Sequence, residues 1–134
     1  GVTMTDFYMS SNLTSRFGEK AQYKGFAGSA GANTRVANGW VEHFECGFWM
    51  GDYVDASQRT YTDGMVIENA RMRNNFADGV NFAQGTANST VRNSSVRGNG
   101  DDGLASWSSI DTSTNSQARI AERNSFILAI GAMA

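Results

Sequence analysis

An asparagine with matching neighbours recurs along this chain, and the recurrence constrains the fold more than any other feature of the sequence. The copies are Asn38, Asn69, Asn93 and Asn124, which are 31, 24 and 31 residues apart. An apolar residue stands three positions after each copy, at Val41, Met72, Val96 and Ile127. Another stands two positions before the first three copies, at Val36, Ile67 and Val91, whereas Glu122 breaks the pattern in the fourth. A strand-like repeat of this length predicts the coils of a parallel β-helix, with longer loops in the longer steps.

In such a fold each coil buries its apolar residues against the coils above and below it. Residues 1–14 have the character of an earlier coil, with Val2, Met4 and Phe7 as candidates for inward positions. The alternative is an antiparallel β-sandwich, which also consists of short strands and Gly/Asn turns. We disfavour it because no Asn-Gly pair stands between two alternating runs, where a tight hairpin would need it. We therefore expect an all-β fold of about four to five coils, with residues 1–134 in a single domain.

Composition and residue counts exclude several functional classes. The formal charge of −2 and the sequence pI of about 5.3 give no basic surface for nucleic acid. No apolar run reaches the roughly 18 residues that span a bilayer. The chain has one cysteine, Cys46, and one histidine, His43, so an internal disulfide and a zinc site with several such ligands are excluded. Ser–His–Asp chemistry stays open only with His43 as its base.

Aspartates recur in register with the repeat. Nine residues after two of the repeated asparagines stand Asp78 and Asp102, each followed by Gly and an apolar residue. The same count in the coil before reaches Gly47. Asp78 and Asp102 should therefore stack on neighbouring coils, about 4.8 Å apart, with Asp101 beside them.

Crowded carboxylates point to chemistry rather than stability. Adjacent strand residues face opposite ways, so Asp101 and Asp102 can share a site only if the backbone turns, and Asn99-Gly100 permits that. Like charges held together should separate their pKa values and leave one carboxyl protonated near neutral pH. Glycoside hydrolysis needs such an acid and a base that activates water. Two other interpretations stay open, because Asp before Gly is a common turn pair and clustered carboxylates bind calcium.

Two segments around these aspartates are distinctive: residues 75–91, which begin Asn-Phe-Ala-Asp-Gly-Val-Asn-Phe, and residues 100–109, which begin Gly-Asp-Asp-Gly-Leu-Ala. They resemble glycoside hydrolase family 87, the bacterial α-1,3-glucanases and mycodextranases. The resemblance is dense over 66–109 and thinner over 1–61; dextranases and polygalacturonases are more distantly similar. It implies a secreted enzyme with a right-handed parallel β-helix that hydrolyses α-glucan with inversion, without a catalytic metal or other cofactor.

The resemblance also implies roles for individual residues. The three aspartates of the family fall on Asp78, Asp101 and Asp102, with Asp101 as general acid and the other two holding the attacking water. Substrate-binding candidates come from the residues themselves. Trp107 and Trp49 offer broad apolar faces for sugar stacking, with core packing as the alternative. Asn81 and Gln84 could hydrogen-bond sugar hydroxyls, although amides near turns often do nothing specific.

The leading hypothesis is therefore an inverting endo-glycoside hydrolase cleaving α-1,3-glucosidic bonds in an α-glucan polysaccharide. Catalytic domains of the family are several times longer than 134 residues, so we expect a fragment that works with other segments or domains of a longer protein. One alternative is a non-catalytic carbohydrate-binding or structural β-solenoid. Another is a dextranase- or polygalacturonase-type glycanase; a uronan substrate would favour basic residues near the aspartates, and their sequence neighbourhood lacks them.

Overall fold

The computed structural model describes residues 1–17, 23–51, 61–83, 85–106 and 125–127. Within these ranges the regular structure is β, and every strand pairing is parallel. None of the described residues forms a helix that could cross a lipid bilayer. The strands are β1 Thr3–Ser10, β2 Lys24–Ala27, β3 Arg35–Glu42, β4 Cys46–Met50, β5 Val66–Glu68, β6 Arg71–Arg73, β7 Val80–Phe82, β8 Thr90–Arg92, β9 Ser95–Arg97, β10 Leu104–Ser106 and β11 Ser125–Ile127.

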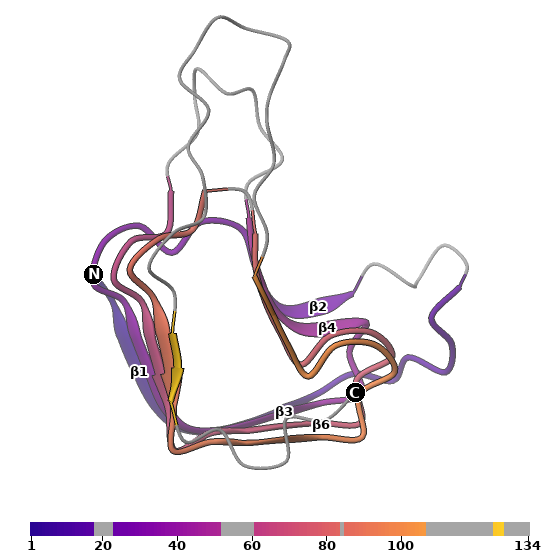
Figure 1. Ribbon diagram of the computed structural model, residues 1–134. Coiled ribbons are helices and arrows are strands. Elements are labelled where there is room, and N and C mark those ends of the chain that lie inside the picture. The colour runs from indigo at the N-terminus through magenta and orange to yellow at the C-terminus, as the bar shows by residue number, and fades with distance from the viewer. Residues whose placement is uncertain (18–22, 52–60, 84, 107–124, 128–134) are drawn as a thin grey trace, which may run out of the picture.

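Strands that lie one repeat apart in the sequence pair side by side. The long strand β3 pairs with β1 on one edge; on the other it pairs with β5 through its first half and with β6 through its second. The order continues from β5 to β8 and β11, and from β6 to β9, while a second sheet has the order β10-β7-β4-β2. Figure 1 shows the strands as walls around a common interior. The prediction of an all-β fold with parallel strands is confirmed.

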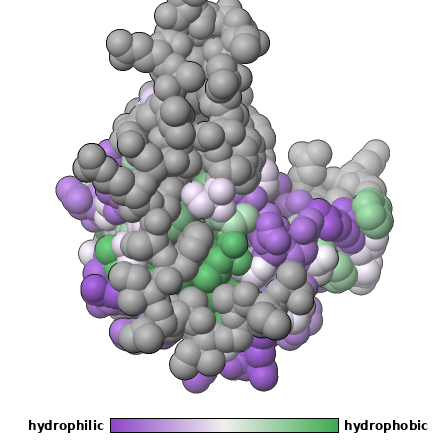
Figure 2. All heavy atoms as spheres, viewed as in Figure 1, coloured by the Kyte–Doolittle hydropathy of each residue, from purple (hydrophilic) through white to green (hydrophobic). Residues whose placement is uncertain are grey.

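The interior is filled by the apolar positions of the repeat. Val36, Ile67 and Val91 pair along one ladder and Val41, Met72 and Val96 along another, and each is at most 2% exposed. The second sheet adds Phe48, Val80 and Phe82 to the same cluster. Figure 2 shows apolar residues gathered at the middle of one face with polar residues around them. Burying each large side chain contributes roughly 1.5–3 kcal/mol, so this column is the main stabilising element of the described fold.

The repeated asparagine marks a corner where the backbone turns left-handed. Asn38, Asn69 and Asn93 have φ values of 55°, 51° and 49°, and Asp6 holds the same corner at 58°. Short polar side chains tolerate this conformation better than other non-glycine residues. Asn124 lies outside the described residues. Two further corners of this kind follow the same register, and they are formed by Asn33, Gly64 and Asn88 and by His43, Asn74 and Gly98.

Residues of the first repeat face the interior as expected, with Val2 and Met4 lining one cavity with Val36 and Met65, but they are not buried there. Val2 is 67% exposed and Met4 is 37% exposed, and only Phe7 is partly buried, edge-on to Phe26 with ring centroids 5.7 Å apart. Met4 does pair with Val36, in the ladder of inward residues. It is nevertheless exposed because, among the described residues, no strand pairs with the outer edge of β1.

Candidate active site

Asp78 and Asp102 occupy the same position in successive repeats, immediately before β7 and β10 begin. The Gly79 amide donates to the Asp102 carbonyl at 3.0 Å, and Val80 pairs with Leu104 in the ladder that follows. The sequence spacing therefore placed these two aspartates correctly with respect to each other.

The expected counterpart in the preceding repeat was wrong by one residue. Phe48 pairs with Val80, which places Cys46, and not Gly47, opposite Asp78. The turn that follows the left-handed corner at His43 is one residue shorter than the equivalent turns in the next two repeats. Cys46 is fully buried, burial raises the pKa of its thiol, and its Sγ donates to the Phe48 carbonyl at 3.1 Å. It is a packing residue.

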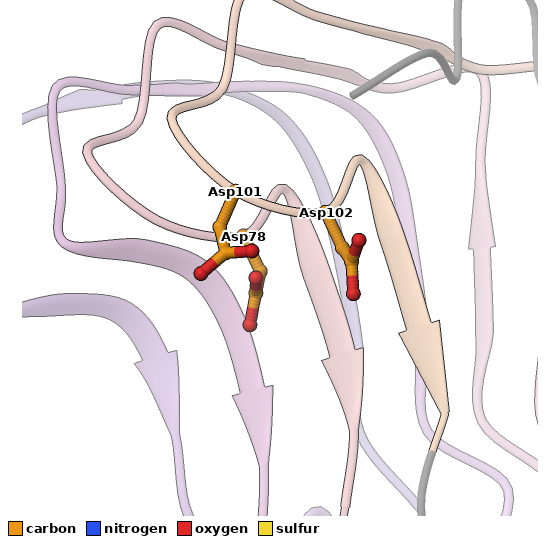
Figure 3. A group of neighbouring side chains, drawn as sticks. All are labelled: Asp78, Asp101 and Asp102. Carbon is orange, nitrogen blue, oxygen red and sulfur yellow. The ribbon is translucent and has the colours of Figure 1, made fainter.

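The structure brings the carboxylates of Asp78, Asp101 and Asp102 together, with one oxygen of each within 4.8 Å of the others. Figure 3 shows the three side chains at the starts of neighbouring strands. Asp78 is 8% exposed, whereas Asp101 and Asp102 are exposed. The expected change of direction is present as a backbone bend at Gly100 and Asp101. The Gly100 amide donates to the Asn75 carbonyl of the preceding repeat at 2.9 Å. A Cβ at Gly100 would lie 2.5 Å from the Phe76 carbonyl oxygen, so this close approach requires glycine.

Asp78 is the carboxyl whose neutral form the site favours. Burial is the largest cause of its raised pKa, and the nearby charges of Asp101 and Asp102 raise it further. A hydrogen bond from Asn81 Nδ2 to Asp78 Oδ2, 2.7 Å long, acts in the opposite direction because it stabilises the ionised form. The crowding predicted from the sequence therefore adds to burial in raising the pKa of Asp78.

Arg16 reaches the cluster from the segment that follows β1. Its Nη2 lies 2.6 Å from Asp101 Oδ2, and both side chains are partly exposed. The hydrogen bond to Asp101 is the main cause of the raised pKa of Arg16, and the charges of Asp78 and Glu45 add to it. Sequence reasoning missed this residue because 85 positions separate it from its partner.

A second ion pair lies next to the aspartates. Lys24 pairs with Cys46 in the strand register, so it belongs to the same row as Asp78 and Asp102. Its Nζ lies 2.9 Å from Glu45 Oε2 and 5.3 Å from the centre of the Trp49 ring, and the Lys24 and Glu45 side chains are largely buried. The sequence neighbourhood of the aspartates lacks basic residues, but the fold brings Arg16 and Lys24 into their surroundings. Both cations are already paired with carboxylates.

The sequence-predicted substrate residues differ in where they fall. Asn81 lies on β7 between Trp49 of β4 and Ala105 of β10, and it contacts Asp78 directly. Trp49 is partly exposed on the adjacent strand. Trp107 and Gln84 lie outside the described residues.

The three carboxylates are also close enough to act as ligands of one cation. Arg16 already supplies a positive charge to this cluster through its ion pair with Asp101. Chemically, the arrangement offers a buried carboxyl that favours its neutral form, two exposed carboxylates and a guanidinium. Carboxyl groups in these two states can donate and accept protons at a bond of a substrate that lies over the exposed side of the cluster.

Comparisons with known proteins agree on one family. The family model described as "Alpha-1,3-glucanase catalytic domain D2" matches residues 1–129. A search of curated proteins found no match. Among solved structures, the Agl-KA catalytic domain is 57% identical, with a TM-score of 0.79 over 92% of this chain and 21% of that chain.

Two further structures are similar at lower identity. The catalytic unit of a thermostable glycoside hydrolase family 87 α-1,3-glucanase from Streptomyces thermodiastaticus strain HF3-3 is 31% identical, with a TM-score of 0.67 over 79% of this chain and 18% of that chain. An aspartate-to-alanine variant of a family 87 α-1,3-glucanase, in complex with tetrasaccharides, is 28% identical, with a TM-score of 0.72 over 91% and 19%. The chain thus spans about a fifth of the length of these catalytic domains. Because the family model covers nearly all of its residues, the chain belongs to the family of α-1,3-glucanase catalytic domains.

Proposed function

We propose that this chain carries the active site of a glycoside hydrolase that cleaves α-1,3-glucosidic bonds in an α-glucan. The observation that carries the proposal is the meeting of Asp78, Asp101 and Asp102 within 4.8 Å in a chain of this family. Related catalytic domains have been crystallised with nigerose and with tetrasaccharides, which supports an α-glucan as the ligand. We also propose that the enzyme is secreted, which rests on the family resemblance.

We further propose that the described repeats are part of a right-handed parallel β-helix that extends beyond these 134 residues in a longer catalytic domain. The in-register parallel ladders at steps of one repeat support it. In such a fold each repeat adds one residue to every row of the outer surface. Residues from several repeats can therefore contact one polysaccharide chain. The row occupied by Asp78 and Asp102 then continues through Cys46 to Lys24.

In the proposed reaction Asp101 protonates the leaving oxygen as the glycosidic C–O bond breaks. Asp78 and Asp102 hold the attacking water, and one of these two carboxylates accepts its proton as the water oxygen bonds to the anomeric carbon. Asp101 is exposed, as contact with a large substrate requires. A carboxylate paired with Arg16 cannot act as an acid, so we propose that substrate binding separates the two side chains and that Asp101, which is exposed, takes its proton from solvent. Asp78 and Asp102 belong to neighbouring strand starts, which lets one water contact both.

We propose an inverting outcome from the family resemblance. Inverting enzymes hold acid and base roughly 6.5–9.5 Å apart to leave room for water, and the nearest carboxylate oxygens here are within 4.8 Å. The nearest atoms are not necessarily the reacting ones, so the stereochemistry of the product decides. The purified full-length protein should be incubated with insoluble α-1,3-glucan, dextran and pectin, with product anomers followed by NMR. Release of β-anomeric sugars from α-1,3-glucan alone supports the proposal. Retention of the α-anomer contradicts inversion, and binding without release favours a carbohydrate-binding solenoid.

A further inference from the structure

Asn81 stands apart from the other buried amides of this fold. Its side chain is 5% exposed, and Nδ2 donates to Asp78 Oδ2 at 2.7 Å. Its Oδ1 is buried and has no hydrogen-bond partner among the described residues. A buried acceptor without a partner costs about 1–3 kcal/mol, so Asn81 is a poor choice if stability alone decides the residue at this position.

Structural asparagines elsewhere in the chain hydrogen-bond from one repeat to the next. Asn75 donates through both its backbone amide and its Nδ2 to Asn99 Oδ1, at 3.1 and 2.9 Å. The strand neighbours of Asn81 are Trp49 and Ala105, neither of which is an amide, so no such ladder forms. The one hydrogen bond made by the Asn81 side chain among the described residues goes to Asp78, three residues earlier on the same repeat.

The contact fixes one end of the Asp78 carboxylate. The Asn81 amide holds Oδ2, and the Asp102 backbone amide also hydrogen-bonds to this carboxylate, so its rotation is restricted. Asp101, Asp102 and Arg16 supply the other charges that act on this carboxylate. Asp101 and Asp102 are exposed, whereas Asp78 is held from within the fold.

We propose that Asn81 is a positioning residue for Asp78, which it holds in the orientation that hydrolysis requires. This inference rests on the proposed glycosidase function and deepens it, because it gives Asn81 a role through Asp78 instead of a direct contact with sugar. Displacing a reacting group by about 1 Å can lower a rate by about 100-fold. Loss of the Asn81 amide should therefore act on the chemical step and leave substrate binding largely intact.

The test compares three variants of the full-length protein on soluble α-1,3-linked gluco-oligosaccharides. Asn81→Ala removes the amide at a position whose strand neighbour is Ala105, so a small residue fits the row. Asn81→Leu removes the amide while filling its volume. Asn88→Ala is the matched control, because Asn88 Nδ2 donates to Asp63 Oδ1 at 2.8 Å in the same kind of contact, on an exposed corner away from the cluster.

We expect kcat to fall about 10- to 100-fold in both Asn81 variants with KM within about twofold of the wild type. Asn88→Ala should keep the wild-type kcat even though its left-handed corner is destabilised by alanine. A raised KM with unchanged kcat would overturn the inference and make Asn81 a sugar-binding residue. Unchanged values of both constants would overturn it too. A wild-type protein that hydrolyses no α-glucan would instead refute the proposed function, which distinguishes the two failures. If one Asn81 variant fails to fold, as judged by circular dichroism, the other decides.

Discussion

Replacing Asp78 by asparagine should stabilise the protein at neutral pH while abolishing its activity. The introduced amide would keep an oxygen to accept the 2.7 Å hydrogen bond from Asn81 and would give up only the weaker contact with the Asp102 backbone amide. The main change is therefore the loss of a negative charge on a residue that is 8% exposed. The nearest oxygens of the three aspartates are within 4.8 Å of one another. At that distance a pair of like charges repels by about 3 kcal/mol at an effective dielectric constant of 20 and by about 1 kcal/mol in water.

Two features of the site reduce the upper figure. Asp102 is exposed, which increases screening, and Asp101 is compensated by Arg16 at 2.6 Å. We therefore expect Asp78→Asn to stabilise the fold by about 1–2 kcal/mol at pH 7, which raises Tm by about 3–8 °C for a chain of this size.

The pH dependence follows from the direction of the pKa shift. Because burial, with the nearby Asp101 and Asp102, raises the pKa of Asp78 in the folded state, the wild type loses stability as pH rises through that folded pKa. Below the pKa of an unfolded aspartate, about 4, both states carry the proton and the advantage of the variant should vanish. Urea unfolding at pH 7 and at pH 3.5 measures the difference.

The control variant has the opposite sign. Hydrogen bonds from Thr5 and Asn38 lower the pKa of Asp6, so Asp6→Asn should lose stability at pH 7 and lose less at pH 3.5, because the contribution of Asp6 fades as pH falls toward its lowered folded pKa. A destabilised Asp78→Asn at pH 7, or an equal gain at both pH values, would refute the conclusion that Asp78 is held under electrostatic and desolvation strain.

Three further predictions concern the frame and the surroundings of the site. Gly79→Ala should destabilise the fold by about 1–3 kcal/mol in urea unfolding. The added Cβ would lie 2.6 Å from both the Gly103 carbonyl oxygen and a Val96 methyl group; an unchanged midpoint would contradict this packing. Glu68→Gln should lower stability at pH 7, because hydrogen bonds from Arg92 and Arg35 lower the pKa of Glu68 in the folded state. This loss should shrink as pH falls below the pKa of an unfolded glutamate, about 4.3, and disappear only below the lowered folded pKa; a loss that does not change with pH would argue against the ion pairs. Arg16→Gln should shift Tm by less than about 3 °C, because partly exposed ion pairs contribute at most about 1 kcal/mol; a larger loss would make Arg16 a structural residue.

Much of the parallel stacking could be predicted from the sequence because the same residue types recur at the same positions of each repeat. The residues two before and three after Asn38, Asn69 and Asn93 are buried because each coincides with the inner side of a strand. The asparagine itself recurs because the corner needs a left-handed backbone. Pairing of Asp78 with Asp102 followed from their equal spacing from Asn69 and Asn93.

The misplaced Gly47 shows where counting fails. When one turn is a residue shorter, counting from the asparagine assigns every later residue of that repeat to the wrong position. A motif that the packing itself requires still marks the correct position. Residues in the row of Asp78 are each followed by Gly and an apolar residue, as in Lys24-Gly25-Phe26, Cys46-Gly47-Phe48 and Asp102-Gly103-Leu104. A Cβ at Gly25, Gly47 or Gly79 would lie 2.5–2.6 Å from a carbonyl oxygen of the next repeat, so the packing requires glycine there. The recurring glycine could therefore have identified the correct register and shown that Lys24 belongs to it.

Other parts of the site had no signal in the sequence. The contact between Arg16 and Asp101 depends on how an irregular segment crosses the surface, and neither spacing nor composition encodes that path. The raised pKa of Asp78 depends on which of three aspartates is buried, and adjacent residues such as Asp101 and Asp102 cannot be ranked for burial from sequence alone. Val2 and Met4 were placed inward by pattern, but burial also requires a neighbour on both edges of β1.

The central claim is that these carboxylates hydrolyse α-1,3-glucan, and one comparison tests it most directly. The full-length wild-type protein and its Asp101→Asn variant are incubated with insoluble α-1,3-glucan, and both released reducing sugar and protein bound to the polysaccharide are measured. We predict release by the wild type, a loss of release by at least about 100-fold in the variant, and equal binding by the two. Equal release of sugar by the variant would contradict the claim.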